Sequence, residues 1–298
     1  MYFLSEEERR LVLRRLLPQS RQTPVAEELR GWNWHQPPLS PIYEVPLGIF
    51  EIAGQYCAGG RDVYLRRVQG VQVPPNQAMV EGSVLHEVVT GIILAAKRVI
   101  YRDGAECLPA LEGLPPPEPL GDDRLSAALR EKIGLLWQFE RHRLLARVQE
   151  ALGQQPHAGP DSLVALALPM TVEQKLNGAF LGLSAHLSVD ACAVAEPMIM
   201  DLKFGRPERF HRLATTGYAL VMESLYEYPV SLGCIVYARF QEGRLVIERD
   251  FHIVDDELRQ WFIEARDERG RLIEEEIDPG LPGECYTGCP YQAICHPA

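Results

Sequence analysis

The spacing of apolar residues predicts mostly helices in the first half of the chain. Residues 5–17 (SEEERRLVLRRLL) place Ser5 as an N-cap, glutamates in the first turn and arginines toward the end, and Pro18 is expected to end this helix. Apolar residues recur every three or four positions in three further segments, which predicts a helix in each: 47–57, 77–101 and 124–152. Residues 19–46 are rich in proline and tryptophan, which predicts an ordered wrapping segment.

The pattern changes after Leu163 to short apolar runs separated by turn signals. The turn NGAFLG lies between two such runs and predicts consecutive antiparallel strands from Leu163 onward. Later strands are predicted at PMIMDLKFG, VSLGCIVYARF and GRLVIERDFHI, with helices over RFHRLATTGYALVMESLYE and DDELRQWFIEARDERGRLIEEE. This order predicts a mixed α/β (α+β) fold. Its sheet core spans 161–278, between a helical N-terminal region 1–160 and a C-terminal cysteine segment 279–298.

Composition and charge narrow the functional classes. The formal net charge of −11 disfavours a surface that binds nucleic acid everywhere through charge, although a local basic channel is compatible with it. The N-terminus lacks the apolar region of a signal peptide, and no uninterrupted apolar run approaches the length of a membrane span. We therefore expect a soluble, cytoplasmic protein that does not contact membranes.

Two aspartates and a lysine stand out among the predicted strands. In SVDACAVAEPMIMDLKFG, Asp190 and Asp201 belong to adjacent strands of a short hairpin, and Lys203 shares one face of its strand with Asp201. Two carboxylates beside an ammonium group suit a divalent-metal phosphodiesterase. A solvated strand face with an ion pair is the alternative. His86, on the helix predicted at 77–101, could add an imidazole ligand or simply be a core or surface residue.

Three of the seven cysteines crowd the C-terminal sequence ECYTGCPYQAIC. Cys285, Cys289 and Cys295 could bind zinc, with either His296 or Cys57 as the fourth ligand. A disulfide framework is disfavoured, because the number of cysteines is odd and they are scattered through a chain without a signal peptide. The remaining three we expect to be buried as small apolar side chains: Cys107, Cys192 and Cys234.

The ordered motifs resemble the RecB-like branch of the PD-(D/E)XK nucleases. That family has G-x-x-x-H, an Asp at a strand end, (D/E)-x-K and Q-x-x-x-Y in this order. The chain has GSVLH ending at His86, SVD ending at Asp190, DLK from Asp201 to Lys203, and ATTGY. The departure is Ala214 in place of the glutamine, which leaves Tyr218 alone in the last motif. A tyrosine on an apolar helix can also be a core residue.

The resemblance implies a RecB-like nuclease core and a set of functional residues. The implied ligands for Mn²⁺ or Mg²⁺ are His86, Asp190, Asp201 and the carbonyl of Leu202, while Lys203 assists the attacking water and Tyr218 positions substrate. Some RecB-like nucleases carry an iron-sulfur cluster on one cysteine before the core and three after it. This order implies a structural [4Fe-4S] cluster on Cys57, Cys285, Cys289 and Cys295.

A stand-alone chain of this kind resembles the CRISPR-associated exonucleases of spacer acquisition, the fourth Cas family. The segments EELRGWNWHQPPLSPIYE and YCAGGRDVYLRRVQG resemble its archaeal type I-A branch. The resemblance implies cleavage of single-stranded DNA ends during prespacer processing, with the CRISPR integrase and other adaptation proteins as partners. A groove for DNA is expected at Arg61, Arg66 and Arg67. The alternative is that these arginines only form the solvent-exposed face of a surface helix. The alternatives are a catalytically weak or inactive iron-sulfur scaffold subunit of the integrase complex, and a DNA-repair nuclease outside CRISPR.

Overall fold

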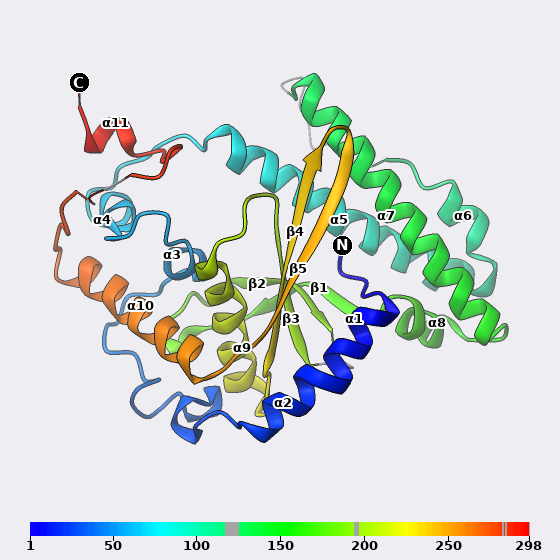
Figure 1. Ribbon diagram of the computed structural model, residues 1–298, viewed down its shortest axis with the longest axis horizontal. Coiled ribbons are helices and arrows are strands. Elements are labelled where there is room, and N and C mark those ends of the chain that lie inside the picture. Colours follow the sequence, from blue (N-terminus) through cyan, green and yellow to red (C-terminus); the bar gives the residue numbers. More distant parts are fainter. Residues whose placement is uncertain (117–124, 194–196, 282, 284, 298) are drawn as a thin grey trace.

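The computed structural model describes residues 1–116, 125–193, 197–281, 283 and 285–297. The hairpin turn expected at 194–196 and most of the break expected at 113–123 lie outside these residues. Within the described part, long helices surround a mixed sheet, so the predicted mixed α/β fold is confirmed (Figure 1). The division into segments 1–160, 161–278 and 279–298 stays a prediction.

A five-stranded sheet with the order β1-β2-β3-β4-β5 forms the centre of the fold (Figure 1). Its strands are Met170–Leu176 (β1), Leu187–Ala193 (β2), Met198–Lys203 (β3), Leu232–Gln241 (β4) and Arg244–Ile253 (β5). Neighbouring strands are antiparallel except β3 and β4, which are parallel. Parallel neighbours need a crossover, and the helix α9 (Arg212–Tyr226) supplies it, as the sequence predicted.

The first helix does not end at Pro18, contrary to the prediction. Helix α1 (Glu6–Leu11) continues through a π-helical stretch (Val12–Leu16) into α2 (Leu17–Gln22). Pro18 lies in the first turn of α2, where its missing N–H costs little because hydrogen bonding has been rearranged by the π-helical stretch before it. Ser5 does cap α1, since its side chain accepts a hydrogen bond from the N–H of Glu8.

The strands also begin later than predicted. Residues Pro160–Ala167 form the helix α8, and β1 begins at Met170. A short apolar run does not distinguish a helix from a strand by its pattern alone. Here a proline at the first helical position favours the helix, and Leu163 and Ala167, four positions apart, are both buried.

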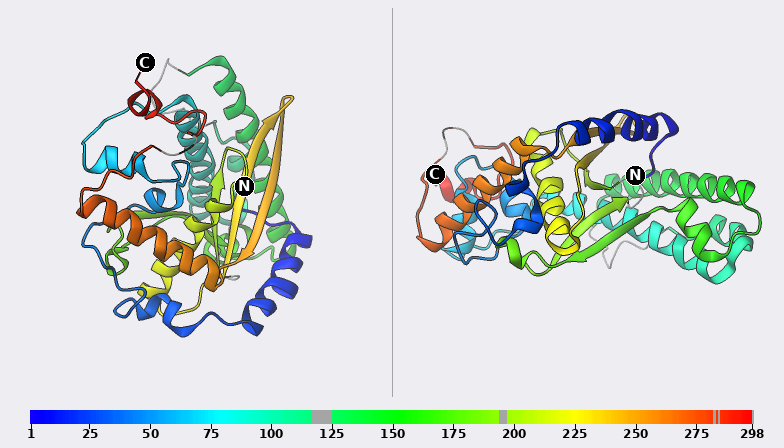
Figure 2. Two further views of the ribbon diagram at one scale, coloured as in Figure 1. Left: turned by 60° about the vertical axis from the view of Figure 1, so that its left-hand side comes forward. Right: turned by 90° about the horizontal axis from the view of Figure 1, so that it is seen from below.

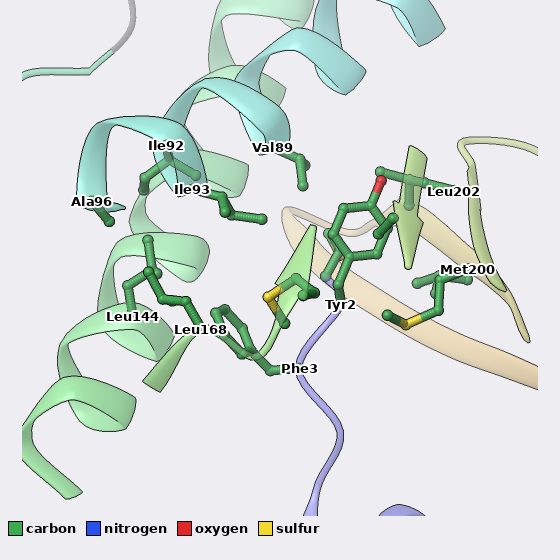
Figure 3. Packing of buried hydrophobic residues seen from close by; sticks show 14 of the residues in the cluster. Tyr2, Phe3, Val89, Ile92, Ile93, Ala96, Leu144, Leu168, Met200 and Leu202 are labelled. Atoms are coloured by element: carbon green, nitrogen blue, oxygen red, sulfur yellow. The ribbon is translucent and has the colours of Figure 1, made fainter. Parts of the chain in front are cut away.

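A layer of helices packs on one face of the sheet. It consists of α5 (Gln77–Asp103), α6 (Leu108–Glu112), α7 (Ala127–Gln154) and α8, and α5 and α7 lie side by side (Figures 1 and 2). Their apolar side chains share one cluster with alternate residues of β3, including Met200 and Leu202. The extended N-terminus enters the same cluster, where Tyr2 lies near Met200 and Leu202 and Phe3 near Leu168 (Figure 3).

By length and composition alone, α5 could cross a membrane, although the sequence analysis expected no such segment. Glutamates and His86 interrupt its apolar residues, which is why no uninterrupted apolar run was found. Leu85, Val89 and Ile93 are almost completely buried in the cluster shared with α7 and the sheet. This burial is typical of a core helix, and the absence of membrane contact stays a prediction.

The other face of the sheet is covered by α9, α10 (Asp256–Glu274) and the short helix α3 (Ile49–Ala53), which share a second apolar cluster. A third, small cluster joins α4 (Arg61–Arg67) to the C-terminal helix α11 (Gln292–Cys295). The wrapping segment is ordered and packs on α9. Short 3-10 turns complete the described elements: Glu27–Leu29, Gly31–Asn33, Gly104–Glu106, Ala179–Leu181 and Arg209–His211.

Candidate active site at the second and third strands

The hairpin of β2 and β3 brings the two predicted aspartates together. Ala191 is paired with Met200, so Asp190 and Asp201 are the next residues of the same antiparallel register. Lys203 follows two positions later on β3, and its Nζ lies 2.9 Å from Oδ2 of Asp201. The predicted sharing of one strand face by Asp201 and Lys203 is therefore confirmed.

His86 reaches this hairpin from α5, which crosses beside it. Its Nε2 lies 2.8 Å from Oδ2 of Asp190. The same carboxylate oxygen accepts a hydrogen bond of 2.8 Å from the backbone N–H of Leu202. Helix α5 and the two consecutive strands β2 and β3 thus place an imidazole, two carboxylates and an ammonium group in one small region. The predicted role of the Leu202 carbonyl as a metal ligand stays a prediction.

Glu173 of β1 is a site residue that the sequence analysis missed. Ligand atoms of His86, Glu173 and Asp190 lie within 4.8 Å of one another, a grouping that could hold a metal ion. Glu173 has a φ of 51°, in the left-handed region that costs free energy for a residue with a side chain, and inside a strand such a position is a candidate for a functional role. No sequence motif marks it, and the observed register of β1 and β2 reveals it, because the pairing of Val172 with Ala191 puts Glu173 across from Asp190.

Burial and mutual charge separate the pKa values of the two aspartates. Burial raises the pKa of Asp201 to about 6, and the negative charge of Asp190 adds to this while Lys203 opposes it. Burial acts in the same direction on Asp190, but the hydrogen bond from His86, the charge of Lys203 and the Leu202 N–H outweigh it and lower its pKa. The carboxylates in turn raise the pKa of His86 against the effect of its burial.

The residues of this site fit a divalent cation. Asp201 is only 5% exposed, yet it carries a carboxylate beside a second one, an arrangement that costs free energy unless positive charge offsets it. Oxygen and imidazole nitrogen together suit Mn²⁺ and also Mg²⁺. Bound there, a cation would neutralise both carboxylates and stabilise negative charge on a phosphate.

Tyr218 and Ala214 lie on α9, near the same site. The hydroxyl of Tyr218 donates a hydrogen bond of 2.6 Å to the carbonyl of Ser188 on β2. Burial raises the pKa of Tyr218, and the charges of Asp190 and Asp201 add to this effect. Ala214 is buried in the apolar cluster under α9, where a small apolar side chain is well accommodated. The substrate-positioning role of Tyr218 stays a prediction.

The cysteine segment folds against α4. Burial raises the pKa of Cys289, and the nearby thiols of Cys57 and Cys295 add to this effect. Cys289 and Cys295 pack on the small apolar cluster between α4 and α11. The Sγ of Cys285 lies 3.2 Å from Nε2 of His296. The segment therefore packs beside α4, which begins four residues after Cys57. In the described part of the chain, however, no three of these thiol and imidazole groups have ligand atoms within 4.8 Å of one another.

The three arginines expected to line a DNA groove are engaged within the protein. Arg66 and Arg67 both form ion pairs with the almost buried Glu51, and Arg61 forms a bidentate pair with Asp278. These contacts fix α4 to α3 and to the chain after α10. They also neutralise much of the charge that a phosphate would need, so DNA binding by these arginines stays a prediction.

A chain of hydrogen bonds lies beside the site. The hydroxyl of Tyr56 is 2.8 Å from Nε2 of His211, whose Nδ1 is 3.1 Å from the hydroxyl of Tyr237. Burial lowers the pKa of His211 to about 4, and the positive charge of Lys203 acts in the same direction. His211 is therefore neutral in the folded protein at pH 7, and its two nitrogens link two tyrosines.

This low pKa predicts a stability change in mild acid. Below pH 6.5 the unfolded chain binds a proton at His211 that the folded protein excludes, so the stability contribution is complete above pH 6.5 and is lost toward pH 4. We expect wild-type protein to lose about 1–3 kcal/mol more than His211→Gln across this window. Urea unfolding at a series of pH values measures the difference. Parallel curves for the two proteins would contradict the assignment.

The fold and the site together define a class: an α+β nuclease fold with carboxylates, a histidine and a lysine at the edge of adjacent central strands. The comparison with protein families then identifies the particular group. The family model of the CRISPR-associated exonuclease Csa1 matches residues 1–298, and the chain belongs to this family. The predicted resemblance to CRISPR-associated exonucleases is thereby confirmed.

Two curated relatives carry the name CRISPR-associated exonuclease Csa1. The protein of Saccharolobus solfataricus is 32% identical over 279 residues, which cover 92% of this chain and 93% of the relative. The protein of Thermoproteus tenax is 31% identical over 271 residues, which cover 91% of each chain. The similarity to each relative therefore extends over more than nine tenths of this chain.

Proposed function

We propose that this member of a CRISPR-associated nuclease family is a divalent-metal-dependent DNA exonuclease. It acts on single-stranded ends and processes prespacers before the CRISPR integrase inserts them. The observation that carries the proposal is the meeting of His86, Asp190, Asp201 and Lys203 from three separate elements. The names of the family and of both relatives support the nuclease class.

Each residue of the site has a chemical task in this proposal. His86, Glu173 and Asp190 have ligand atoms within 4.8 Å of one another and would hold Mn²⁺ or Mg²⁺ together with Asp201 of the neighbouring strand. Such an ion would lower the pKa of an attacking water and stabilise charge on the phosphate. Lys203 presents its ammonium group next to Asp201, where it can orient the water and stabilise developing negative charge. Tyr218 supports the strand that carries Asp190.

The direct test uses anaerobically purified protein and end-labelled DNA. We expect progressive shortening of linear single strands with Mn²⁺ or Mg²⁺, no cutting in EDTA, slower cutting of blunt duplexes and no cutting of circular single strands. The circular substrate separates an exonuclease from an endonuclease. Absence of cutting by a folded protein on every linear substrate would contradict the proposal.

We further propose that Cys57, Cys285, Cys289 and Cys295 hold a [4Fe-4S] cluster that stabilises the fold. The packing of Cys289 and Cys295 against α4, close after Cys57 in the sequence, supports this, and four thiolates are the usual ligand set. The cluster would supply a covalent link between regions that are far apart in sequence. His296, beside Cys285, offers the alternative of a zinc site.

Replacing Cys57 by alanine tests the cluster. We expect the iron content to fall from about four atoms per chain to nearly none and the protein to unfold at clearly lower denaturant concentration, since metal binding and folding are coupled. Cys107→Ala, at a buried cysteine outside this segment, should keep its iron. Normal folding of an iron-free Cys57→Ala protein would show that the cluster is not structural. A content of one zinc ion per wild-type chain, without iron, would show that the cysteines form a zinc site instead of a cluster.

A scaffold subunit of the integrase complex is the second candidate. The net charge of −11 and the internal pairing of Arg61, Arg66 and Arg67 favour it, because both leave little free positive charge for DNA. A scaffold would bind the integrase with equal affinity whether Asp201 is present or replaced. Pull-down of the integrase by wild-type and Asp201→Asn proteins, next to the cleavage assay, distinguishes the two functions.

A further inference from the structure

Three aromatic side chains gather beside the candidate active site. The rings of Tyr56 and Phe210 are 4.9 Å apart in an edge-to-face arrangement, and the rings of Tyr56 and Tyr286 are 4.9 Å apart and tilted. Tyr56 is 45% exposed and Tyr286 is 51% exposed, while Phe210 is half-buried. We call Tyr56, Phe210 and Tyr286 the aromatic platform. Half of each tyrosine therefore faces solvent although a neighbouring ring is within contact distance.

The platform lies close to the carboxylates and the lysine. His211, which is hydrogen-bonded to Tyr56, also contacts the hydroxyl of Tyr237 on β4, and Tyr237 is paired with Lys203 across the parallel strands. Burial raises the pKa of Tyr56, and the charge of Asp201 adds to this while that of Lys203 opposes it. Phe210 follows the loop that leaves β3 after Lys203. The same loop carries Arg206, an exposed side chain with no ion-pair or hydrogen-bond partner among the described residues. Within the described ranges, an unpaired arginine and partly exposed aromatic rings thus lie next to the loop that follows Lys203.

Tyr56 is held firmly in this position. Its hydroxyl is hydrogen-bonded to His211, which is 3% exposed and is itself anchored by Tyr237. The ring of Phe210 also contacts His211, with 4.9 Å between ring centroids. A ring that is fixed at its hydroxyl end loses little conformational entropy when a ligand stacks on its exposed face.

We propose that the aromatic platform stacks the unpaired bases of a single-stranded DNA end and guides the adjoining phosphate to the site of Asp201 and Lys203. The proposal rests on the proposed function and names how its substrate is held. Stacking on aromatic rings tolerates any base sequence and requires no large positive surface. It therefore suits an acidic protein whose predicted DNA-binding arginines are paired internally. In a duplex the base faces are covered by stacking on the neighbouring base pairs, so the platform favours single strands.

The cysteine segments build this platform. Tyr56 directly precedes Cys57, and Tyr286 directly follows Cys285. Docking of the C-terminal segment against the N-terminal half therefore brings together two rings that are 230 positions apart in sequence, counting from 56 to 286. The correct placement of this segment, whatever metal it binds, becomes a condition for holding the substrate.

Binding of short fluorescent oligonucleotides by the full chain in EDTA tests the proposal without cleavage. Wild-type protein should bind a single strand tighter than the same strand with abasic sites, and should change the fluorescence of 2-aminopurine placed near one end. Tyr56→Ala and Tyr286→Ala should each bind at least about fivefold more weakly and lose this preference. Tyr56→Phe keeps the aromatic ring and should retain the preference for the strand without abasic sites. Tyr228→Ala alters an exposed stacked tyrosine outside the platform and serves as the control.

The outcomes separate this inference from the proposed nuclease. Unchanged binding and an unchanged abasic preference in both alanine variants, with DNA cleavage intact in wild type, would overturn the platform and leave the nuclease in place. Loss of the preference in both variants, with a wild-type protein that does not cut, would support the platform and overturn the nuclease. Equal weakening in Tyr228→Ala would show a general effect on folding and would also overturn the platform.

Discussion

Asp201→Asn should lower the rate of DNA cleavage about a thousandfold while leaving the free energy of unfolding unchanged or somewhat higher. The loss follows because Asp201 is the carboxylate that faces Lys203 and is proposed to bind the cation. The gain in stability follows because burial and Asp190 raise the pKa of Asp201 to about 6, so its charged form at pH 7 is unfavourable in the folded protein. An amide of the same shape removes this cost.

Opposite changes in activity and stability are the signature of a functional carboxylate, because a structural one would lose both. Cleavage rates and urea unfolding are measured on the same preparations, in metal-free buffer for the unfolding. Lys203→Ala should lose a comparable part of the rate. Glu131→Gln alters an exposed acid on α7 and should behave as wild type. Retention of more than a tenth of the wild-type rate by Asp201→Asn would remove this residue from the site.

Glu223→Ala should have the largest effect on stability, a loss of about 3–5 kcal/mol in the free energy of unfolding. The carboxylate of Glu223 is fully buried and accepts hydrogen bonds of 2.7 and 2.9 Å from the equally buried Arg259 and of 2.8 Å from Arg30. Backbone N–H groups of Gly31 and Val230 donate to it as well. Its removal leaves two arginines without their counter-charge inside the protein.

This cluster fixes the wrapping segment (residues 19–46) to α9 and α10, so removal of the Glu223 carboxylate should also detach the segment from these helices. Gly31 approaches α9 so closely that a Cβ there would lie 2.1 Å from the carbonyl oxygen of Leu220. Limited proteolysis should therefore cut between residues 19 and 46 in Glu223→Ala and spare wild type. Glu264→Ala, at an exposed position of α10, should change stability by less than about 0.5 kcal/mol. A loss below about 1 kcal/mol in Glu223→Ala would show that the cluster contributes little.

Local patterns were enough to predict the central part of the site. The alternation of side chains along a strand put Asp201 and Lys203 on one face, and the hairpin put Asp190 on the neighbouring strand. Apolar spacing identified α5, on which His86 lies. Each of these inferences needs only the geometry of one element or of two consecutive strands. Two predicted boundaries were wrong: the helix continues past Pro18, and the chain at Leu163 is helical where a strand was predicted. In both places the local pattern is compatible with either structure.

The contacts that pair the arginines of α4 and that bring Glu173 into the site could not be predicted from such local patterns. Glu51 captures Arg66 and Arg67 across a turn between two helices, and Asp278 captures Arg61 from more than 200 positions away. Glu173 joins the site through a backbone conformation that no sequence pattern announces. These partners belong to different elements, and the packing of the whole chain determines which of them meet.

The sequence by itself determined the class of fold, the order of the motifs and the residue types that carry the chemistry, since periodicity and spacing act within single elements. The tertiary structure alone decided that Glu173 stands with His86 and Asp190, that the arginines of α4 are internally paired, and that Tyr56 meets Tyr286 beside Lys203. Burial and the approach of distant segments set the free energy of such contacts, and neither is encoded in any one stretch of sequence.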